Sequence, residues 1–326
     1  MIVITGGTGH LGNVLVRKLV NMNKKVRALI LPGEDITSLK GLEIEKIEGD
    51  VRLPDSLRKA FEGADIVYHC AGIISILPGQ RKQLYQVNVI GTKNVVNMCL
   101  KTKVKRLVYT SSIHALSEPA PGIVFNESRE FNPENVLGEY SKSKALGTLE
   151  VLKGVEKGLD AVILCPSGII GPYDYRISEM GKLIVDFIKG KIKASVSGAY
   201  DFVDVRDVAE GLILACEKGR KGECYILSGQ QISVGRLLEF LGEISGIKVP
   251  SFKIPQPLAR VAGFFNVLYC NLIKIKPLFT PFSIDVLASN SLVSCQKAQD
   301  ELGYSPRSIY ESIKDAVRWF REEGII

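Results

Sequence analysis

Thr5-Gly6-Gly7-Thr8-Gly9-His10-Leu11-Gly12 follows an apolar run, Ile2–Thr5, and opens an amphipathic stretch, His10–Met22. In this setting Gly6 permits a tight turn, Gly9 lets the backbone approach a pyrophosphate, and Gly12 lets the helix pack closely on the strand. The N-terminus of such a helix offers unpaired N–H groups and the positive end of its dipole to phosphates. The stretch predicts a dinucleotide-binding turn; the alternative interpretation is a tight turn without a ligand.

Strand and helix patterns alternate through the first half of the chain. The apolar runs are rich in β-branched residues, as in strands that helices cover on both faces. The expected strands are Ile2–Thr5, Lys25–Ile30, Glu43–Glu48, Ile66–Cys70, Arg106–Thr110 and Ala161–Cys165. The expected helices are His10–Met22, Pro54–Phe61, Tyr85–Leu100 and Leu137–Lys157. This order predicts an α/β protein with a Rossmann doubly wound parallel sheet.

The alternation stops after Pro166, where Gly and Pro gather. We therefore expect an NAD(P)-binding Rossmann domain at residues 1–165 and a smaller C-terminal substrate-binding lobe at residues 166–326. Some segments of the second part, at about residues 200–230, should return to the Rossmann sheet. Within the lobe, Ile232–Ser245 and Ser308–Glu323 have helical patterns.

Composition narrows the class of protein. The chain has 326 residues and a formal net charge of +7, which fits an anionic ligand, and its basic residues are too scattered to predict nucleic-acid binding. An odd number of cysteines, seven, without a Cys-x-x-Cys pair argues against a disulfide framework and favours the cytoplasm. The three histidines are not spaced for a metal site. No apolar run reaches the ~18–20 residues of an integral membrane span.

Catalytic residues are expected at two places. Tyr140 and Lys144 are four residues apart in a helical stretch and share a face, so the ammonium should lower the pKa of the phenol. Ser112 follows the fifth strand, where a hydroxyl can bind a substrate oxygen, and it is preferred to Ser111. Asn88 lies in a helix below this site, either to relay protons to Lys144 or to make a plain structural hydrogen bond.

Cofactor choice depends on the end of the second strand. An acid there favours NAD and a nearby Arg favours NADP, but the chain has Leu31 and Pro32. Glu34 and Asp35 lie just beyond. The missing Arg slightly favours NAD.

Together these motifs resemble the extended short-chain dehydrogenase/reductase family, part of the NAD-dependent epimerase/dehydratase superfamily. The runs Val26–Leu29, Tyr109–Ile113 and Pro166–Pro172 are similar to the branch that contains dihydroflavonol 4-reductases and 3β-hydroxysteroid dehydrogenases. Leu31 departs from that branch, which often has Arg there. The cofactor contacts that the motifs and the resemblance imply are Gly6, Thr8, Gly9, His10, Leu11, Gly12, Asp50, Val51, Cys70, Ala71, Gly72, Tyr140, Lys144, Pro166, Gly168 and Ile169.

The resemblance also implies an activity. The nicotinamide of NAD or NADP would exchange a hydride with a carbon of the substrate. Tyr140 would move the proton on the substrate oxygen, Ser112 would hold that oxygen, and Lys144 would bind the nicotinamide ribose. Substrate contacts are expected from Ser75, His114 and Phe202, and an apolar pocket wall from Leu258, Phe264, Phe265, Leu268, Tyr269, Phe279 and Phe282. The expected substrate is a small hydrophobic alcohol or ketone, steroid-like or flavonoid-like.

Two other functions fit the same sequence. A sugar-nucleotide epimerase or dehydratase would hold NAD tightly and need cations in the second lobe, which Arg176, Lys182, Lys189, Lys191 and Lys193 could supply. A non-catalytic dinucleotide-sensing regulator would keep the fold without turnover, but such proteins often lose the Tyr or the Lys. A homodimer through Tyr85–Leu100 and Leu137–Lys157 is expected from the family resemblance.

Overall fold

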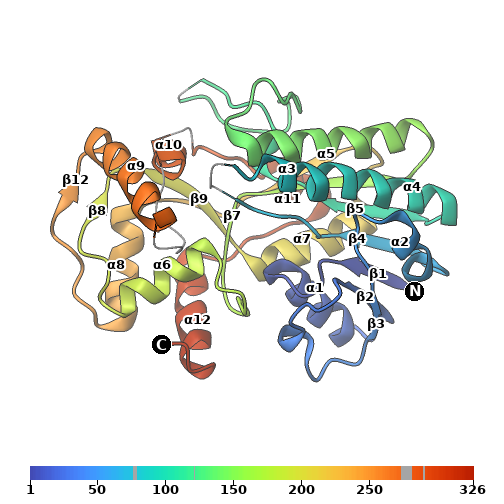
Figure 1. Cartoon of the computed structure of the whole chain (residues 1–326), viewed down its shortest axis with the longest axis horizontal. Helices are drawn as coiled ribbons and strands as arrows, with labels where there is room; N and C mark the ends of the chain where they lie inside the picture. The colour runs from blue at the N-terminus through green and yellow to red at the C-terminus, as the bar shows by residue number, and fades with distance from the viewer. Residues whose placement is uncertain (76–78, 121, 273–280, 289–290) are drawn as a thin grey trace.

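The computed structural model describes residues 1–75, 79–120, 122–272, 281–288 and 291–326 (Figure 1). The strands are β1 Ile2–Thr5, β2 Val26–Ile30, β3 Glu45–Glu48, β4 Ile66–His69, β5 Arg106–Thr110, β6 Ala161–Pro166, β7 Gly168–Ile170, β8 Ser195–Val196, β9 Ala199–Asp204, β10 Cys224–Leu227, β11 Gln230–Ser233 and β12 Lys253–Ile254. The α-helices are α1 His10–Asn21, α2 Pro54–Phe61, α3 Arg81–Leu84, α4 Thr92–Thr102, α5 Gly138–Glu156, α6 Glu179–Ile188, α7 Val205–Lys218, α8 Val234–Ser245, α9 Gln256–Leu272, α10 Pro281–Ala288, α11 Gln296–Leu302 and α12 Ile309–Glu322. Short 3₁₀ turns cover η1 Thr37–Leu39 and η3 Ile113–Ala115, and η2 Tyr85–Gly91 is a π-helix.

A seven-stranded sheet forms the centre of the molecule. Its strand order is β10-β6-β5-β4-β1-β2-β3, and every neighbouring pair is parallel. The order reverses between β1 and β4, and ligands of doubly wound sheets bind at the carboxyl ends of the strands at this point. The expected α/β doubly wound fold is confirmed, and the first glycine turn lies at the reversal.

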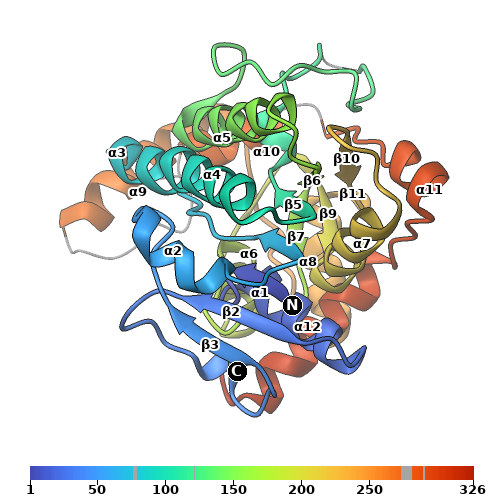
Figure 2. The ribbon, with the colours of Figure 1, turned by 90° about the vertical axis from the view of Figure 1, so that its right-hand side faces the viewer.

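Helices cover both faces of this sheet (Figures 1 and 2). On one face α2, α4 and α5 bury an apolar cluster that includes Phe61, Val95 and Val151. On the other, α1 and α7 pack against each other and bury Leu15 and Leu212 with the sheet. Strands buried on both faces need apolar side chains throughout, which explains the continuous apolar run of β6.

The chain after β6 builds a second cluster of elements, at the left in Figure 1. A three-stranded sheet of order β11-β9-β7 and the pair β12-β8 lie there with α6, α8 and α12. Their shared core includes Phe187, Leu241 and Phe320. By contrast, β10 pairs with β6 at the edge of the large sheet. The division at residues 165 and 166 stays a prediction.

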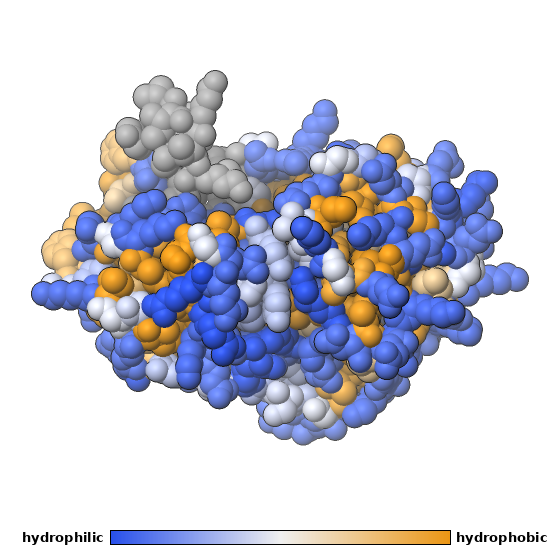
Figure 3. All heavy atoms as spheres, turned by 90° about the horizontal axis from the view of Figure 1, so that it is seen from below, coloured by the Kyte–Doolittle hydropathy of each residue, from blue (hydrophilic) through white to orange (hydrophobic). Residues whose placement is uncertain are grey.

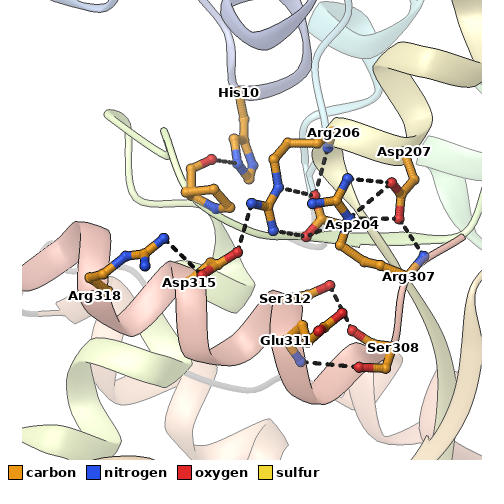
Figure 4. A network of polar contacts seen from close by, with 11 residues as sticks. His10, Asp204, Arg206, Asp207, Arg307, Ser308, Glu311, Ser312, Asp315 and Arg318 are labelled. Atoms are coloured by element: carbon orange, nitrogen blue, oxygen red, sulfur yellow. Dashed lines mark hydrogen bonds and ion pairs between the residues drawn. The ribbon is translucent and has the colours of Figure 1, made fainter.

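A polar network joins the start of α7 to α12 and the turn before it (Figure 4). Arg206 pairs with Asp204 and with Asp315 of α12, both at 2.7 Å. Arg307 donates to both carboxylate oxygens of the buried Asp207. Because buried carboxylates are costly unless they are paired, these arginines hold α12 and the turn before it against the end of β9 and the start of α7.

Two expected helices differ from the structure. The helix predicted at Tyr85–Leu100 begins earlier, at Arg81, and passes through a π turn at Tyr85–Gly91. The helix predicted from Ile232 begins at Val234, because Ile232 pairs with Tyr200 in the antiparallel β11–β9 ladder. Neither a π turn nor a strand partner leaves a local sequence signal.

Helix α9 carries three of the side chains expected in the apolar pocket wall, Leu258, Phe264 and Phe265. They are more than half exposed, and their place in a pocket wall stays a prediction. Phe279 and the side chains of Leu268, Tyr269 and Phe282 lie outside the described part of the structure. Apolar and hydrophilic patches alternate on the face seen in Figure 3. Among the residues that the structure describes, no helix has the length and apolarity of a membrane span.

Candidate active site

The glycine turn after β1 is tightly constrained. Gly6 has φ +71°, and a Cβ on it would lie 2.6 Å from the amide nitrogen of Ala71. A Cβ on Gly12 would lie 2.0 Å from the carbonyl oxygen of Gly6. Only glycine fits at these two positions, which bring the first turn against the end of β4.

The same turn has one open side, at Gly9. A Cβ there would contact only the Gly6 carbonyl oxygen, at 3.4 Å. Gly9 caps α1 without a side chain, and the first turn of α1 has no acidic residue. The first N–H groups of α1 therefore lack a local anionic partner, which fits the pyrophosphate of a dinucleotide.

Three residues of this turn that were expected to contact the cofactor, Thr8, His10 and Leu11, each make a different contact within the protein. Leu11, in the first turn of α1, is partly buried against the apolar core. His10 donates a 2.9 Å hydrogen bond through Nε2 to the Pro172 carbonyl oxygen, because a carbonyl oxygen can only accept. The Thr8 hydroxyl accepts a 2.9 Å hydrogen bond from Arg176. His10 and Thr8 thus connect the glycine turn to the loop after β7.

The end of β4 lies directly beside the end of β1. The Cys70 and Ala71 amides donate to the Thr5 carbonyl and hydroxyl oxygens, at 3.1 and 3.3 Å. Gly72 follows and is exposed, and a Cβ on it would approach the Lys144 Nζ to 3.5 Å. The structure therefore brings Cys70, Ala71 and Gly72 together with the glycine turn and Lys144.

Asp50 and Val51 lie at the end of β3. Arg52 binds both carboxylate oxygens of Asp50, with Nε at 3.0 and 2.9 Å, and this pairing lowers the pKa of Asp50. Val51 is buried, and a Cβ on Gly91 would lie 2.7 Å from its side chain. Both carboxylate oxygens of Asp50 are thus bound by Arg52, and they can still accept a further hydrogen bond from a ligand.

Pro166, Gly168 and Ile169 connect the two sheets. Pro166 ends β6 opposite Leu227 of β10, and Ile169 packs partly buried against the core. A Cβ on Gly168 would lie 2.6 Å from the ring of Tyr200. Gly168 is therefore required for close packing on β9, in addition to any contact with a cofactor.

Lys144 lies in α5 with its ammonium pointing to the end of β5. Its Nζ donates a 2.8 Å hydrogen bond to the carbonyl oxygen of Thr110. The side chain is buried, and burial lowers the pKa of Lys144 to about 8. A buried ammonium with one protein acceptor keeps donor capacity for hydroxyl groups of a ligand.

Tyr140 lies one turn before Lys144 on α5 and is half-buried. Burial raises the pKa of Tyr140 to about 12, and a hydrogen-bonding contact with the Ser112 hydroxyl acts in the opposite direction. The expected lowering by Lys144 is absent from this structure, because the ammonium is directed to Thr110. Ser112 thus faces the phenol, whereas Ser111 bonds Thr148 at 2.7 Å.

Asn88 lies in the π turn and is completely buried. Its side-chain amide binds both backbone groups of Ile73, at 2.9 and 3.0 Å, and donates to the Ser143 hydroxyl at 2.9 Å. Its polar atoms are therefore taken up by the loop after β4 and by α5. These contacts support the structural interpretation over the proton relay.

A pocket opens beside α5. Apolar side chains make up about half of its lining, and the polar residues are His114, Glu118, Ser141, Tyr200, Asp201 and Ser291. The His114 Nε2 lies 2.6 Å from the Tyr200 hydroxyl oxygen, and the His114 and Tyr140 rings meet edge to face at 6.5 Å. Burial lowers the pKa of His114 to about 4, so the ring is neutral at pH 7.

Two expected substrate residues do not line this pocket. Phe202 is buried in the core of the second group of elements, with its ring 5.2 Å from that of Tyr200. Ser75, three residues beyond Gly72, is partly buried. The sequence reasoning missed Tyr200, although its two-residue spacing from Phe202 in an apolar strand was a usable signal.

Residues 2–234 match the model of the NAD dependent epimerase/dehydratase family. The chain belongs to this family. The resemblance to extended short-chain dehydrogenases/reductases is confirmed, and with it an NAD(P)-dependent oxidoreductase of that family.

Several relatives match over almost the whole length of this family member. It is 37% identical over 326 residues to sterol demethylase protein B of Methylococcus capsulatus, with 99% of each chain covered. It is 32% identical over 327 residues to a putative dihydroflavonol 4-reductase of Synechocystis sp., covering 99% of this chain and 95% of the relative. The crystal structure of gox2253 matches with a TM-score of 0.88 at 32% identity, covering 99% of this chain and 98% of that one.

Proposed function

We propose that this chain interconverts a hydrophobic secondary alcohol and its ketone, with a steroid-like or flavonoid-like ring system as substrate. The observation that carries the proposal is the grouping of Ser112, Tyr140 and Lys144 at the carboxyl end of β5, at the same sheet edge as the glycine turn after β1. The Ser112 hydroxyl contacts the phenol, and the Lys144 ammonium lies at the end of the same strand, β5.

Each of these residues has a separate task. Ser112 donates a hydrogen bond to the substrate oxygen and fixes it beside the phenol. In ketone reduction the Tyr140 hydroxyl donates its proton to that oxygen; in alcohol oxidation the phenolate accepts it. The nicotinamide, when bound, supplies or accepts the hydride. Lys144 holds the nicotinamide ribose with the donor capacity that its hydrogen bond to Thr110 leaves free.

The pocket supports an apolar substrate. Ile113, Val136 and Val286 contribute apolar walls, and the polar groups of His114 and Tyr200 are bonded to each other. A neutral pair of this kind orients a ligand without requiring it to be charged. The names of the two curated relatives, a sterol demethylase protein and a putative dihydroflavonol reductase, agree with this class of substrate.

The cations that would favour a sugar-nucleotide substrate are largely engaged. Lys182 and Lys191 both pair with the buried Asp186. Arg176 pairs with Glu34 at 2.6 Å, on the side of the glycine turn. These pairs reduce the positive charge that a substrate pyrophosphate would need in the second lobe.

The test is a nicotinamide absorbance assay with steroid, flavonoid and nucleotide-sugar substrates, each with NADH and NADPH and with NAD and NADP. We expect turnover of a ring ketone or alcohol. Tyr140→Phe should reduce turnover at least about a hundredfold while cofactor affinity changes little.

The matched control is Tyr85→Phe, which removes the hydroxyl of an exposed tyrosine. This variant should keep the rate of the natural chain. Full turnover by Tyr140→Phe, or activity confined to nucleotide sugars, would overturn the proposal.

A further inference from the structure

The turn after β2 brings a carboxylate back to the end of that strand, where the sequence itself has Leu31 and Pro32. Leu31, Pro32, Gly33 and Glu34 form a β-turn in which the Glu34 amide donates to the Leu31 carbonyl oxygen at 3.0 Å and Gly33 has φ +74°. The Glu34 carboxylate folds back and accepts a 3.3 Å hydrogen bond from the Leu31 amide. An acid from outside the strand thus lies at the strand end.

Asp35, the neighbouring acid, points elsewhere. Its Oδ1 accepts hydrogen bonds from both the amide and the hydroxyl of Thr37, at 2.9 and 2.7 Å. These two bonds hold the Asp35 carboxylate at Thr37, the first residue of the short 3₁₀ turn. Of the two acids beyond β2, only Glu34 is directed to the strand end.

A cation from the second group of elements reaches the same place. The Arg176 Nη2 lies 2.6 Å from Oε1 of Glu34 and donates a 2.9 Å hydrogen bond to the Thr8 hydroxyl. Thr8 belongs to the glycine turn. The guanidinium therefore bridges the glycine turn and the end of β2, which together border the adenosine ribose site in this fold.

The loop that carries Arg176 is held firmly. The buried Asp174 accepts from the Ser178 amide and hydroxyl at 2.8 and 2.6 Å, and the Ile177 amide donates to the Asp174 carbonyl oxygen. Asn13 of α1 donates to the Tyr173 carbonyl oxygen at 3.1 Å. Arg176 thus extends from a fixed base toward the glycine turn.

We propose that Glu34 and Arg176 determine the choice between NAD and NADP, with Glu34 selecting NAD. The Glu34 carboxylate accepts a hydrogen bond from a ribose hydroxyl and repels a 2′-phosphate. Arg176 fixes the carboxylate in place, and the pairing also neutralises the charge of this guanidinium. This proposal rests on dinucleotide binding by the proposed oxidoreductase and names the residues that choose between the two cofactors.

Removing the charge of Glu34 should reverse the role of Arg176. With Gln at position 34 the guanidinium loses its carboxylate and is free to pair with a phosphate, for which its planar donor geometry is well suited. Glu34→Gln should therefore strengthen NADP binding and weaken NAD binding. Adding Arg176→Met should remove the gain for NADP.

The experiment measures dissociation constants for NAD and NADP by calorimetry with the full chain. The natural chain should bind NAD more tightly, and Glu34→Gln should change the ratio of the two constants at least about tenfold toward NADP. Asp35→Asn is the matched control, because it removes the same charge one residue away; its ratio should stay within about twofold of the natural one.

The outcomes separate the two proposals. A preference for NADP in the natural chain, an equal change of both constants in Glu34→Gln, or no binding of either dinucleotide would overturn the role of the pair. The expected shift in binding, found in a chain that turns over no alcohol or ketone, would support this role and refute the proposed reaction.

Discussion

The ammonium of Lys144 donates a 2.8 Å hydrogen bond to the carbonyl oxygen of Thr110, the last residue of β5. This bond fixes the first turns of α5 against the strand end that carries Ser112. Tyr140 belongs to the same helix, so its phenol and the Ser112 hydroxyl are held together by the fold itself. The grouping that we propose as catalytic is therefore formed without a ligand, as preorganised catalysis requires.

Replacing Lys144 with Met should separate catalysis from folding. The apolar side chain fits a buried site where the ammonium is costly, so we expect the free energy of unfolding to change by no more than about 1–2 kcal/mol. Turnover should fall at least about a hundredfold, because the nicotinamide ribose loses the ammonium that we propose holds it in place. Steady-state rates and urea unfolding check both expectations.

Lys142→Met is the control for the Lys144 variant. Lys142 lies two residues earlier in α5 and is only partly buried. Since residues two apart on a helix face different directions, this change should leave turnover nearly unaltered. Natural turnover in Lys144→Met would contradict the assignment of the lysine.

Gly9 and Gly12 should respond differently to an added methyl group. In Gly12→Ala the Cβ would lie 2.0 Å from the Gly6 carbonyl oxygen, so the turn must shift. We expect a loss of roughly 1–3 kcal/mol in the free energy of unfolding, together with weaker dinucleotide binding.

Gly9→Ala should instead affect binding alone. Gly9 has an ordinary backbone conformation, φ −72° and ψ 170°, and its nearest Cβ contact would be at 3.4 Å. Stability should change by less than about 1 kcal/mol, whereas dinucleotide affinity should fall at least about tenfold because the methyl group occupies the open side of the turn. Calorimetric titration with NAD, beside urea unfolding, distinguishes the two variants; equal affinities would refute the proposed pyrophosphate position.

The sequence predicts some parts of this molecule better than others, for physical reasons. Strands at Ile2–Thr5 and Arg106–Thr110 have the predicted bounds because continuous apolar runs between turns are local signals. Ser112 could be proposed because it follows a recognisable strand, and Tyr140 and Lys144 because they lie four residues apart at the start of a recognisable helix. In these regions the spacing of residues along the chain is enough to predict the position of the side chains.

Contacts between distant segments could not be predicted in this way. Glu34 and Arg176 meet only because the loop after β7 returns to α1, and no local pattern in either segment indicates the other. The direction of the Lys144 ammonium, toward Thr110, is likewise a tertiary property. The pKa of Tyr140 depends on these contacts and on burial, so a spacing of four residues was insufficient to predict it.

Asn88→Ala should destabilise the chain. The change leaves the amide and carbonyl of Ile73 and the hydroxyl of Ser143 without their present partner. We expect a loss of roughly 2–4 kcal/mol, measured by urea unfolding. Asn97→Ala, at an exposed position of α4, should cost less than about 1 kcal/mol. Natural stability in Asn88→Ala would contradict its structural role.

Acid should destabilise the chain through two histidines, the buried His69 and the half-buried His114. Burial and the nearby Lys144 lower the pKa of His69 to about 3, and burial lowers that of His114 to about 4, from 6.5 for both. Between pH 6.5 and 4 the unfolded chain therefore binds more protons than the native one, so the free energy of unfolding falls as the pH falls. Each histidine contributes a slope of at most about 1.4 kcal/mol per pH unit.

His69→Gln tests this pH dependence. The His69 ring bonds the Thr5 and Thr92 hydroxyls at 2.7 and 3.0 Å, and Gln can donate to or accept from both without gaining a proton in acid. The variant should be less stable than the natural chain at pH 7.5, and its stability should decline less steeply toward pH 5. Urea midpoints at pH 7.5, 6 and 5 measure both slopes. An unchanged slope would mean that His69 is protonated in the native chain as readily as in the unfolded one, contrary to its burial between β1 and the π turn.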